Sequence, residues 1–202
     1  MWVRIAALAL LAPGAVMAQT REPLGGLYGD IRIVTSTLPS GPGWTPTLAT
    51  GALVPGRGFG ADAGAHVFVG PGRHRRLSVG VTGLAGQGRA AGVDPAPAVT
   101  TRFFAAAPHA SMNFGHAQGW SYLGLGLGLA KVSSTYTGAP TESASWGSVV
   151  HYGGGARWFL TPRVAVGLDL RFWALTPKPA TATRPRGAAT TRVAFGAGVS
   201  FR

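Results

Sequence analysis

Residues 120–131 read WSYLGLGLGLAK, a stretch in which large apolar residues alternate with small ones. Leu123, Leu125, Leu127 and Leu129 fall on one face of an extended chain, and the residues between them are glycines. A period of two residues indicates a β-strand with two different faces, because an α-helix repeats about every 3.6 residues. The stretch therefore predicts a strand with one bulky apolar face and one small-residue face.

The same alternation recurs along the chain and predicts eight strands. They fall at about 27–33, 59–69, 77–87, 100–114, 120–131, 148–160, 164–175 and 192–202. Pro108 weakens the fourth of these predictions, since proline has no N–H group to donate to a neighbouring strand.

The connections between these strands alternate in length. Those at 70–76, 115–119 and 161–163 are short, and those at 36–58, 88–99, 133–147 and 176–189 are longer. Membrane-spanning barrels show this asymmetry, with short periplasmic turns and longer outer loops. We predict an all-β fold: a single eight-stranded antiparallel transmembrane β-barrel of the up-and-down type.

Glycine indicates which face of the strands meets lipid. A soluble barrel would turn the leucines inward and leave Gly124, Gly126 and Gly128 exposed in a strand interior, where glycine packs nothing. With the leucines outward, the glycines lie in a narrow lumen that has little room.

Three of the six acids and four arginines of the strands fall on this glycine face. Facing lipid at mid-depth costs about 2 to 4 kcal/mol for Arg or Lys, so we expect these side chains inside the barrel, where they can pair. The predicted lumen charge network consists of Asp30, Arg32, Asp62, Arg157, Asp169, Arg171 and Arg192. A solvated face of a soluble barrel is the alternative.

The first 18 residues are typical of a secretory signal peptide. Arg4 precedes an apolar stretch at 5–12, and Val16-Met17-Ala18 forms a small-residue cleavage site. Residues 19–202 then form one barrel domain. The chain contains no cysteine, which excludes disulfides and thiolate chemistry.

The formal net charge is +12, or +11 once Arg4 is removed. An exported chain with scattered basic residues is a poor candidate for nucleic-acid binding, and anionic lipid is the expected partner. Five basic residues of the long connections are predicted to meet lipopolysaccharide headgroups, although ordinary solvated loops remain the alternative: Arg57, Arg89, Lys178, Arg184 and Arg186.

Aromatic residues near the predicted strand ends indicate two girdles at the membrane interfaces. Phe114, Trp120, Tyr122, Trp158 and Phe159 flank the short turns, and Phe59, Phe103, Phe172 and Trp173 lie toward the long connections.

Few motifs suggest chemistry. Residues 124–128 read GLGLG, but a phosphate-binding loop would be followed by a helix, and none is predicted here. His66, His109 and His151 share the lumen face without the local spacing of a metal site. The pair His109 and Ser111 resembles the His-x-Ser pair of outer-membrane lipid A deacylases, which also need a carboxylate, and the only glutamates, Glu22 and Glu142, lie outside the predicted strands. We assign no catalytic, cofactor-binding or metal-binding residue.

Two segments carry a wider resemblance. With its signal peptide, eight alternating strands and terminal Val199-Ser200-Phe201-Arg202, the chain resembles the small outer-membrane barrels of the OmpA and OmpX type. The segments SMNFGHAQGWSYLGLGLG (111–128) and YGGGARWFLTPRVAVGLDLRFWAL (152–175) resemble uncharacterised barrel proteins of environmental bacteria. The resemblance implies fold and location in the outer membrane of a Gram-negative cell, and no activity.

The expected function is therefore non-enzymatic: a structural or surface-interaction barrel with a charge-plugged lumen. The alternatives are a small-solute channel and, less favoured, a lipid A-modifying enzyme. Expected partners are outer-membrane lipids, lipopolysaccharide and the barrel-assembly machinery, with no nucleic acid and no cofactor, and the protein is expected to be a monomer.

Overall fold

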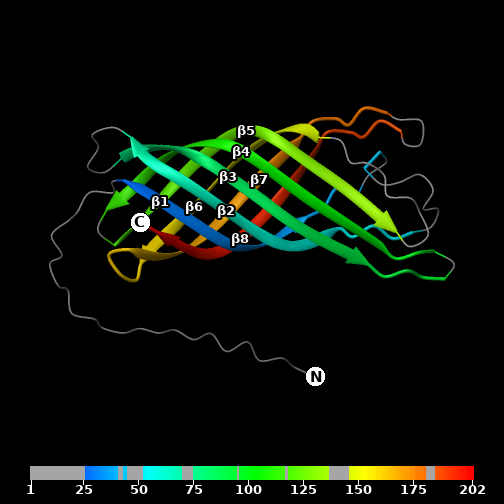
Figure 1. The fold of residues 1–202 in the computed structure, drawn as a ribbon, viewed down its shortest axis with the longest axis horizontal. Coiled ribbons are helices and arrows are strands. Elements are labelled where there is room, and N and C mark those ends of the chain that lie inside the picture. Colours follow the sequence, from blue (N-terminus) through cyan, green and yellow to red (C-terminus); the bar gives the residue numbers. More distant parts are fainter. Residues whose placement is uncertain are drawn as a thin grey trace, which may run out of the picture.

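The computed structural model describes residues 26–40, 43–44, 52–69, 75–94, 96–116, 118–136, 146–180 and 185–202. They form eight strands, β1 (Leu27–Thr37), β2 (Arg57–Val69), β3 (Arg75–Ala90), β4 (Val99–His116), β5 (Gly119–Tyr136), β6 (Trp146–Phe159), β7 (Val164–Leu175) and β8 (Thr190–Phe201). Each strand pairs antiparallel with the next, and β8 closes on β1 (Figure 1). The predicted eight-stranded antiparallel barrel is confirmed. The predicted signal peptide, residues 1–18, lies outside the described residues.

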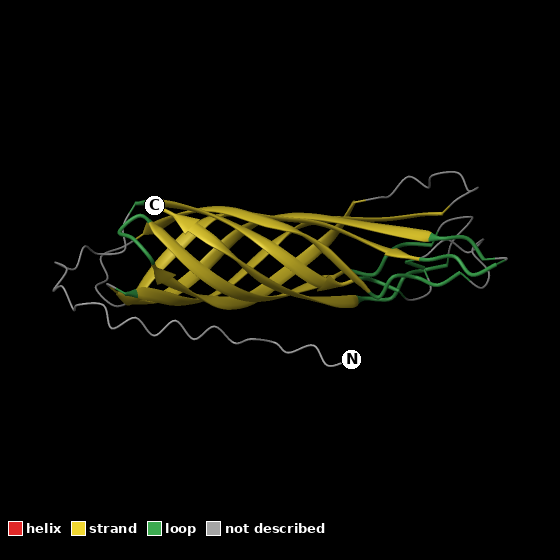
Figure 2. Ribbon diagram, turned by 90° about the horizontal axis from the view of Figure 1, so that it is seen from below, coloured by secondary structure: helices red, strands yellow, loops and turns green. Residues whose placement is uncertain are grey.

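The strands cross the barrel axis obliquely (Figure 2). Three connections, after β2, β4 and β6, are short and lie at the end that also holds the C-terminus (Figure 1). The other four lie at the opposite end. We call these the short-turn end and the long-connection end. No helix among the described residues is long and apolar enough to cross a membrane.

Several strands extend beyond their predicted limits at the long-connection end. β4 and β5 each contain 18 residues and stay paired as far as Val99 and Tyr136. The outward side chains become polar there, as at Thr100 and Ser133, so the apolar alternation that predicted the strands ends before the backbone pairing does.

Pro108 lies inside β4, where the pairing adapts to it. The register with β3 is continuous through Val81 and Pro108. The register with β5 is interrupted between the pairs Ala106–Leu129 and Ala110–Leu125. The missing N–H therefore faces β5, and the strand survives with a local gap on one side.

The apolar face of every strand points outward. Leu123, Leu125, Leu127 and Leu129 are 53 to 66% exposed, and every other strand contributes exposed large apolar side chains as well. A continuous belt of this kind is unstable in water and matches the lipid-facing band of a membrane barrel. The predicted orientation of the two faces is confirmed.

The lumen is filled in three layers. Tyr28, Trp120 and Tyr122 pack with Phe68 and Phe159 at the short-turn end. Buried charges occupy the middle. A larger apolar cluster fills the long-connection end; its members include Val34, Leu84, Phe103, Val132, Val149, Trp173 and Leu175.

The prediction of two aromatic girdles is wrong for five of its nine residues. Trp120, Tyr122, Phe159, Phe103 and Trp173 point into the lumen. The physical reason is that the two-residue alternation continues to the strand ends, so proximity to an end does not turn a side chain outward. Outward aromatic side chains at the long-connection end include Phe59, Phe104 and Trp146, and Trp158 lies outward at the other end.

Candidate functional site: the charged lumen

Six buried charged residues meet in the middle of the lumen. Asp30 and Arg32 come from β1, Asp62 from β2, Arg157 from β6, and Asp169 and Arg171 from β7; all six are at most 6% exposed. Their inward direction follows from strand parity, because every second residue faces the interior. The set holds three arginines and three aspartates, so its formal charges balance.

Arg32 contacts all three carboxylates. Its guanidinium donates to Asp30 and to Asp62, and its Nε lies 2.7 Å from Oδ2 of Asp169. Arg32 pairs in register with Asp62 on one side and with Gly198 on the other. A Cβ on Gly198 would lie 2.8 Å from Cγ of Arg32, so this glycine leaves the space that the arginine occupies.

Arg171 bonds across the barrel. Its Nη1 donates to Oδ2 of Asp62 at 3.0 Å and to Oγ1 of Thr82 at 2.6 Å, and its Nη2 donates to the hydroxyl of Tyr122 at 3.1 Å. Arg171 belongs to β7 and Thr82 to β3, which are opposite strands in a closed barrel of eight. The hydrogen bond between them therefore spans the lumen.

Asp169 is held by a second arginine and by tyrosine. Nη2 of Arg157 donates to its Oδ1 at 3.0 Å, and the hydroxyl of Tyr122 donates to the same oxygen. Tyr122 reaches Asp169 over Gly155, which lies between them in the register of β5, β6 and β7. Arg157 also donates from Nε to the hydroxyl of Ser200 at 2.9 Å.

Each of the six buried charges has at least one oppositely charged partner. Burial of an ion costs several kcal/mol, and this cost is offset only when the ion is paired and hydrogen-bonded with good geometry. The cavity among Arg32, Asp62, Asp169, Arg171 and their neighbours has a volume of about 10 Å³. That is space for about one water molecule. The arrangement can hold the strands together and fill the lumen at this level.

Arg192, the seventh predicted member, lies apart from the network. Its Nε donates to the carbonyl of Thr37 at 2.6 Å and its Nη2 to the hydroxyl of Ser36 at 2.7 Å. Its guanidinium carbon stands 3.6 Å from the ring centroid of Phe103. Arg192 is therefore held by neutral acceptors and a cation–π contact within the apolar layer.

Sequence reasoning identified three lumen histidines but missed how they are arranged. Tyr28, His66, Gly80 and His109 are consecutive register partners across β1 to β4. His151 is the register partner of Trp173 on β6 and β7. The histidine rings are in contact: His66 and His109 have centroids 5.0 Å apart, and His109 and His151 are stacked at 5.1 Å. No group of three or more His, Cys, Asp or Glu with metal-binding geometry occurs among the described residues.

The His109 and Ser111 pair is not arranged as a nucleophile and base. The Ser111 hydroxyl lies 2.6 Å from the hydroxyl of Ser78, and His109 packs against the rings of His66, Tyr122 and His151. Nδ1 of His109 has no hydrogen-bond partner among the described residues. Glu22 and Glu142 lie outside the described residues.

Trp44 covers the long-connection end of the lumen, which the sequence did not predict. Its indole Nε1 donates to the carbonyl of Ala188 at 2.8 Å. Lys178 lies over the Trp44 ring at 5.8 Å and donates to the carbonyl of Val132 at 3.3 Å. The prediction that Lys178 meets headgroups is wrong, because the side chain is buried in this contact. Arg57, Arg89 and Arg186 are exposed, and Arg184 lies outside the described residues.

No protein-family model and no curated protein matches the chain. Among solved structures it is similar to Neisserial surface protein A (NspA), with a TM-score of 0.55 and 15% identity over 87% of this chain and 96% of that one. It is similar to Ail, the attachment invasion locus protein of Yersinia pestis, in complex with the heparin analogue sucrose octasulfate, with a TM-score of 0.51 and 12% identity over 88% and 99% of the two chains. A weaker likeness, at a TM-score of 0.45 and 8% identity, is to the outer membrane protease OmpT of Escherichia coli. At these identities the similarity is one of fold, and the fold of this chain is that of a small outer-membrane β-barrel.

Proposed function

We propose that the protein is a non-enzymatic outer-membrane barrel with a structural or surface-interaction role and a lumen closed by its own charges. The observation that carries this proposal is the hydrogen bond from Arg171 to Thr82, which joins opposite walls of the barrel. An eight-stranded barrel has an interior only about wide enough for side chains, so a bond across it leaves no continuous path for solutes.

The alternative of a small-solute channel is less well supported. Apolar side chains fill both ends of the lumen, and the centre has space for about one water molecule. Planar-bilayer recording of the refolded protein tests this point. We expect no steady conductance, and a stable open pore in the wild type would favour the channel.

The enzyme alternative is also less well supported. His109 and Ser111 are buried in the lumen, away from lipid. Their hydrogen bonds and ring contacts serve packing, and no carboxylate among the described residues orients the imidazole. The location away from lipid argues against lipid A as a substrate. Incubation of the refolded barrel with lipid A, followed by mass analysis of the acyl chains, should show no product.

The surface role rests on charge at the long-connection end. Arg57, Arg89, Arg102 and Arg186 are exposed there, and Asp94 is the exposed acid among the described residues of that end. The similar structure of Ail holds a sulfated polyanion. We propose that this end faces outward and contacts anionic partners, lipopolysaccharide first among them, and that the protein is inserted as a monomer by the barrel-assembly machinery after residues 1–18 are removed.

Cell fractionation tests the location. The protein should partition with the outer membrane, and folded protein should migrate differently from boiled protein in detergent gels. Recovery as a soluble periplasmic protein would refute the proposal.

A further inference from the structure

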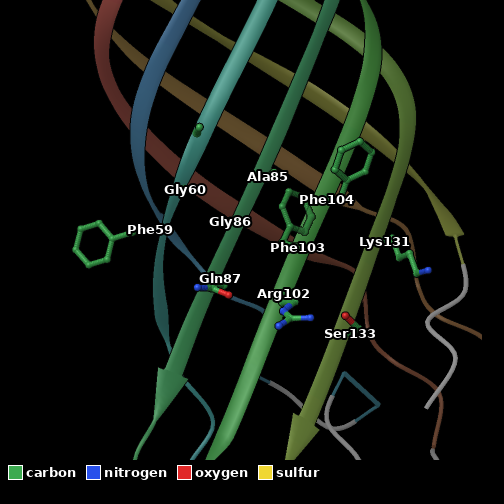
Figure 3. A pocket seen from close by; sticks show the side chains of 11 residues that line it. Phe59, Gly60, Ala85, Gly86, Gln87, Arg102, Phe103, Phe104, Lys131 and Ser133 are labelled. Atoms are coloured by element: carbon green, nitrogen blue, oxygen red, sulfur yellow. The ribbon is translucent and has the colours of Figure 1, made fainter. Parts of the chain in front are cut away.

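The outer wall of the barrel is not uniformly convex. A groove with a volume of about 570 Å³ crosses β2, β3, β4 and β5 on the outside, toward the long-connection end (Figure 3). This volume falls in the range of about 300 to 1,000 Å³ that small-molecule sites occupy. The network in the lumen does not use this groove.

Two rows of outward side chains line the groove. The row nearer the long connections consists of Phe59, Gln87, Arg102 and Ser133, which are consecutive register partners across four strands. The next row consists of Ala61, Ala85, Phe104 and Lys131, again in register. The side of the groove on β4 and β5 is therefore polar and basic, and we call Arg102, Lys131 and Ser133 its basic edge. The floor on β2 and β3 is apolar.

The groove is hollow because its floor is built from small side chains. Ala85 stands between the larger Phe59 and Phe104, which form the two sides of the groove (Figure 3), and its register partner on β2 is Ala61. One row further toward the middle of the barrel, β2 and β3 again contribute small residues, Ala63 and Gly83, in register. A narrow apolar strip of the groove floor thus leads from the basic edge toward the lipid-facing belt.

The basic edge lies where the membrane surface is expected. Phe104 packs edge-on against Trp146 with ring centroids 5.7 Å apart, and Trp146 is the register partner of Lys131. Exposed aromatic side chains mark the headgroup level of a membrane barrel. Arg102 and Lys131 are therefore at the depth of lipid headgroups, with the apolar floor directed toward the acyl chains.

The charge of this edge is uncompensated within the described residues. Neither Arg102 nor Lys131 forms an ion pair there, and the one described acid on β2 to β5 is Asp62, which faces the lumen. Two cations over an apolar strip complement a molecule with an anionic head and a hydrocarbon tail. Gln87 and Ser133 add neutral hydrogen-bond donors beside the two cations.

We propose that this groove binds a phosphorylated, acylated lipid of the outer leaflet. Its phosphate contacts Arg102 and Lys131, and one acyl chain lies over Ala61 and Ala85 between Phe59 and Phe104. The inference rests on the proposed outer-membrane function and adds a site on the barrel wall, separate from the exposed arginines of the connections.

The first test measures lipid binding to the refolded barrel in neutral nanodiscs by native mass spectrometry, with bisphosphorylated lipid A and its dephosphorylated form as probes. In the variant R102Q/K131Q we expect affinity for the phosphorylated form to fall tenfold or more, about 1.4 kcal/mol, and affinity for the dephosphorylated form to stay constant. The variant R163Q/R202Q removes two charges at the short-turn end, away from the groove and from the long connections, and is the matched control. Equal affinity of R102Q/K131Q and this control would overturn the inference.

The second test fills the apolar floor of the groove. Ala85→Phe places a ring over the groove floor on the lipid-facing side, where an apolar side chain does not harm folding, and Ala65→Phe is the control on the same wall outside the groove. We expect A85F alone to weaken both lipid probes. Unchanged binding in A85F, or a change in oligomeric state in place of lipid loss, would overturn the lipid assignment. Fractionation and conductance of the same samples report separately on the proposed function, because a folded, closed outer-membrane barrel that binds no lipid in this groove refutes only the site.

Discussion

Asp62 shows how strongly single residues determine this lumen. It accepts hydrogen bonds from Arg32 on the neighbouring strand and from Arg171 on β7. Strand parity was sufficient to place these residues inside the barrel from sequence. Their pairing could not be predicted, because it depends on the register and on which long side chain reaches which carboxylate.

We predict that Asp62→Ala destabilises the barrel by about 3 to 5 kcal/mol, since it leaves two buried guanidinium groups short of a partner. Urea unfolding in lipid vesicles, followed by tryptophan fluorescence, measures the change. Asp94→Ala removes an exposed acid and should alter stability by less than about 0.5 kcal/mol. If the two variants unfold at the same urea concentration, the network does not stabilise the barrel.

Glycines in the lumen leave the space that the long polar side chains occupy. Gly167 and Gly198 lie between Arg157 and Arg32 in a continuous register across β6, β7, β8 and β1. A glycine in the lumen can leave either a water-filled pocket or room for a neighbouring side chain. In the structure, the space beside them is taken by neighbouring side chains.

Gly167→Ala should therefore destabilise the barrel by about 1 to 3 kcal/mol through overpacking. An added Cβ would lie 2.5 Å from Cδ of Arg157 and 2.8 Å from the carbonyl of Ala156. Gly83→Ala is the matched control, because its Cβ would meet the carbonyl of Ala105 at 3.6 Å, an ordinary contact. Thermal unfolding midpoints of the two variants decide the point, and equal midpoints would mean that Arg157 moves aside at no cost.

At the scale of elements, the alternation located all eight strands, because one face contacts lipid and the other a crowded lumen. It failed where that contrast ends. The outward faces of β4 and β5 are polar near the long-connection end, so the alternation did not locate the full length of these strands. Trp120 and Trp173 lie near strand ends but point into the lumen, so nearness to an end did not predict their direction. The segment around Trp44 has no periodicity, so its position over the lumen could not be predicted.

Removal of the Trp44 side chain should expose a lysine without unfolding the barrel. The chain contains two lysines: Lys178 is buried beneath Trp44, and Lys131 lies on the outer wall. In Trp44→Ala, we expect Lys178 to react with a water-soluble amine reagent several-fold faster, measured by peptide mass spectrometry. Lys131 serves as the internal reference and should react at an unchanged rate. No change at Lys178 would show that Trp44 does not shield it.

At the scale of the whole molecule, arginine side chains occupy two environments, the lumen and the outer wall. Arg32, Arg157 and Arg171 are buried with their carboxylates, whereas Arg102 lies on the outer wall without an acidic partner among the described residues. Composition and net charge cannot distinguish these two populations. The barrel separates them by strand parity, since β4 turns its even-numbered residues outward and β1 turns them inward.

This separation predicts two responses to salt in one protein. Screening acts on exposed charges, with a Debye length of about 10 Å at 0.1 M and about 3 Å at 1 M, and reaches buried pairs much less. Between about 0.1 and 1 M KCl, the thermal midpoint of the wild type in neutral lipid should change little, while affinity for phosphorylated lipid A falls. Asp62→Ala removes the carboxylate paired with Arg171 and one of the three paired with Arg32, so its midpoint should become salt-dependent as chloride enters. The contrary result is a wild-type midpoint that falls with salt as steeply as the midpoint of Asp62→Ala changes. It would mean that ions already reach the network and that the lumen is open to solvent.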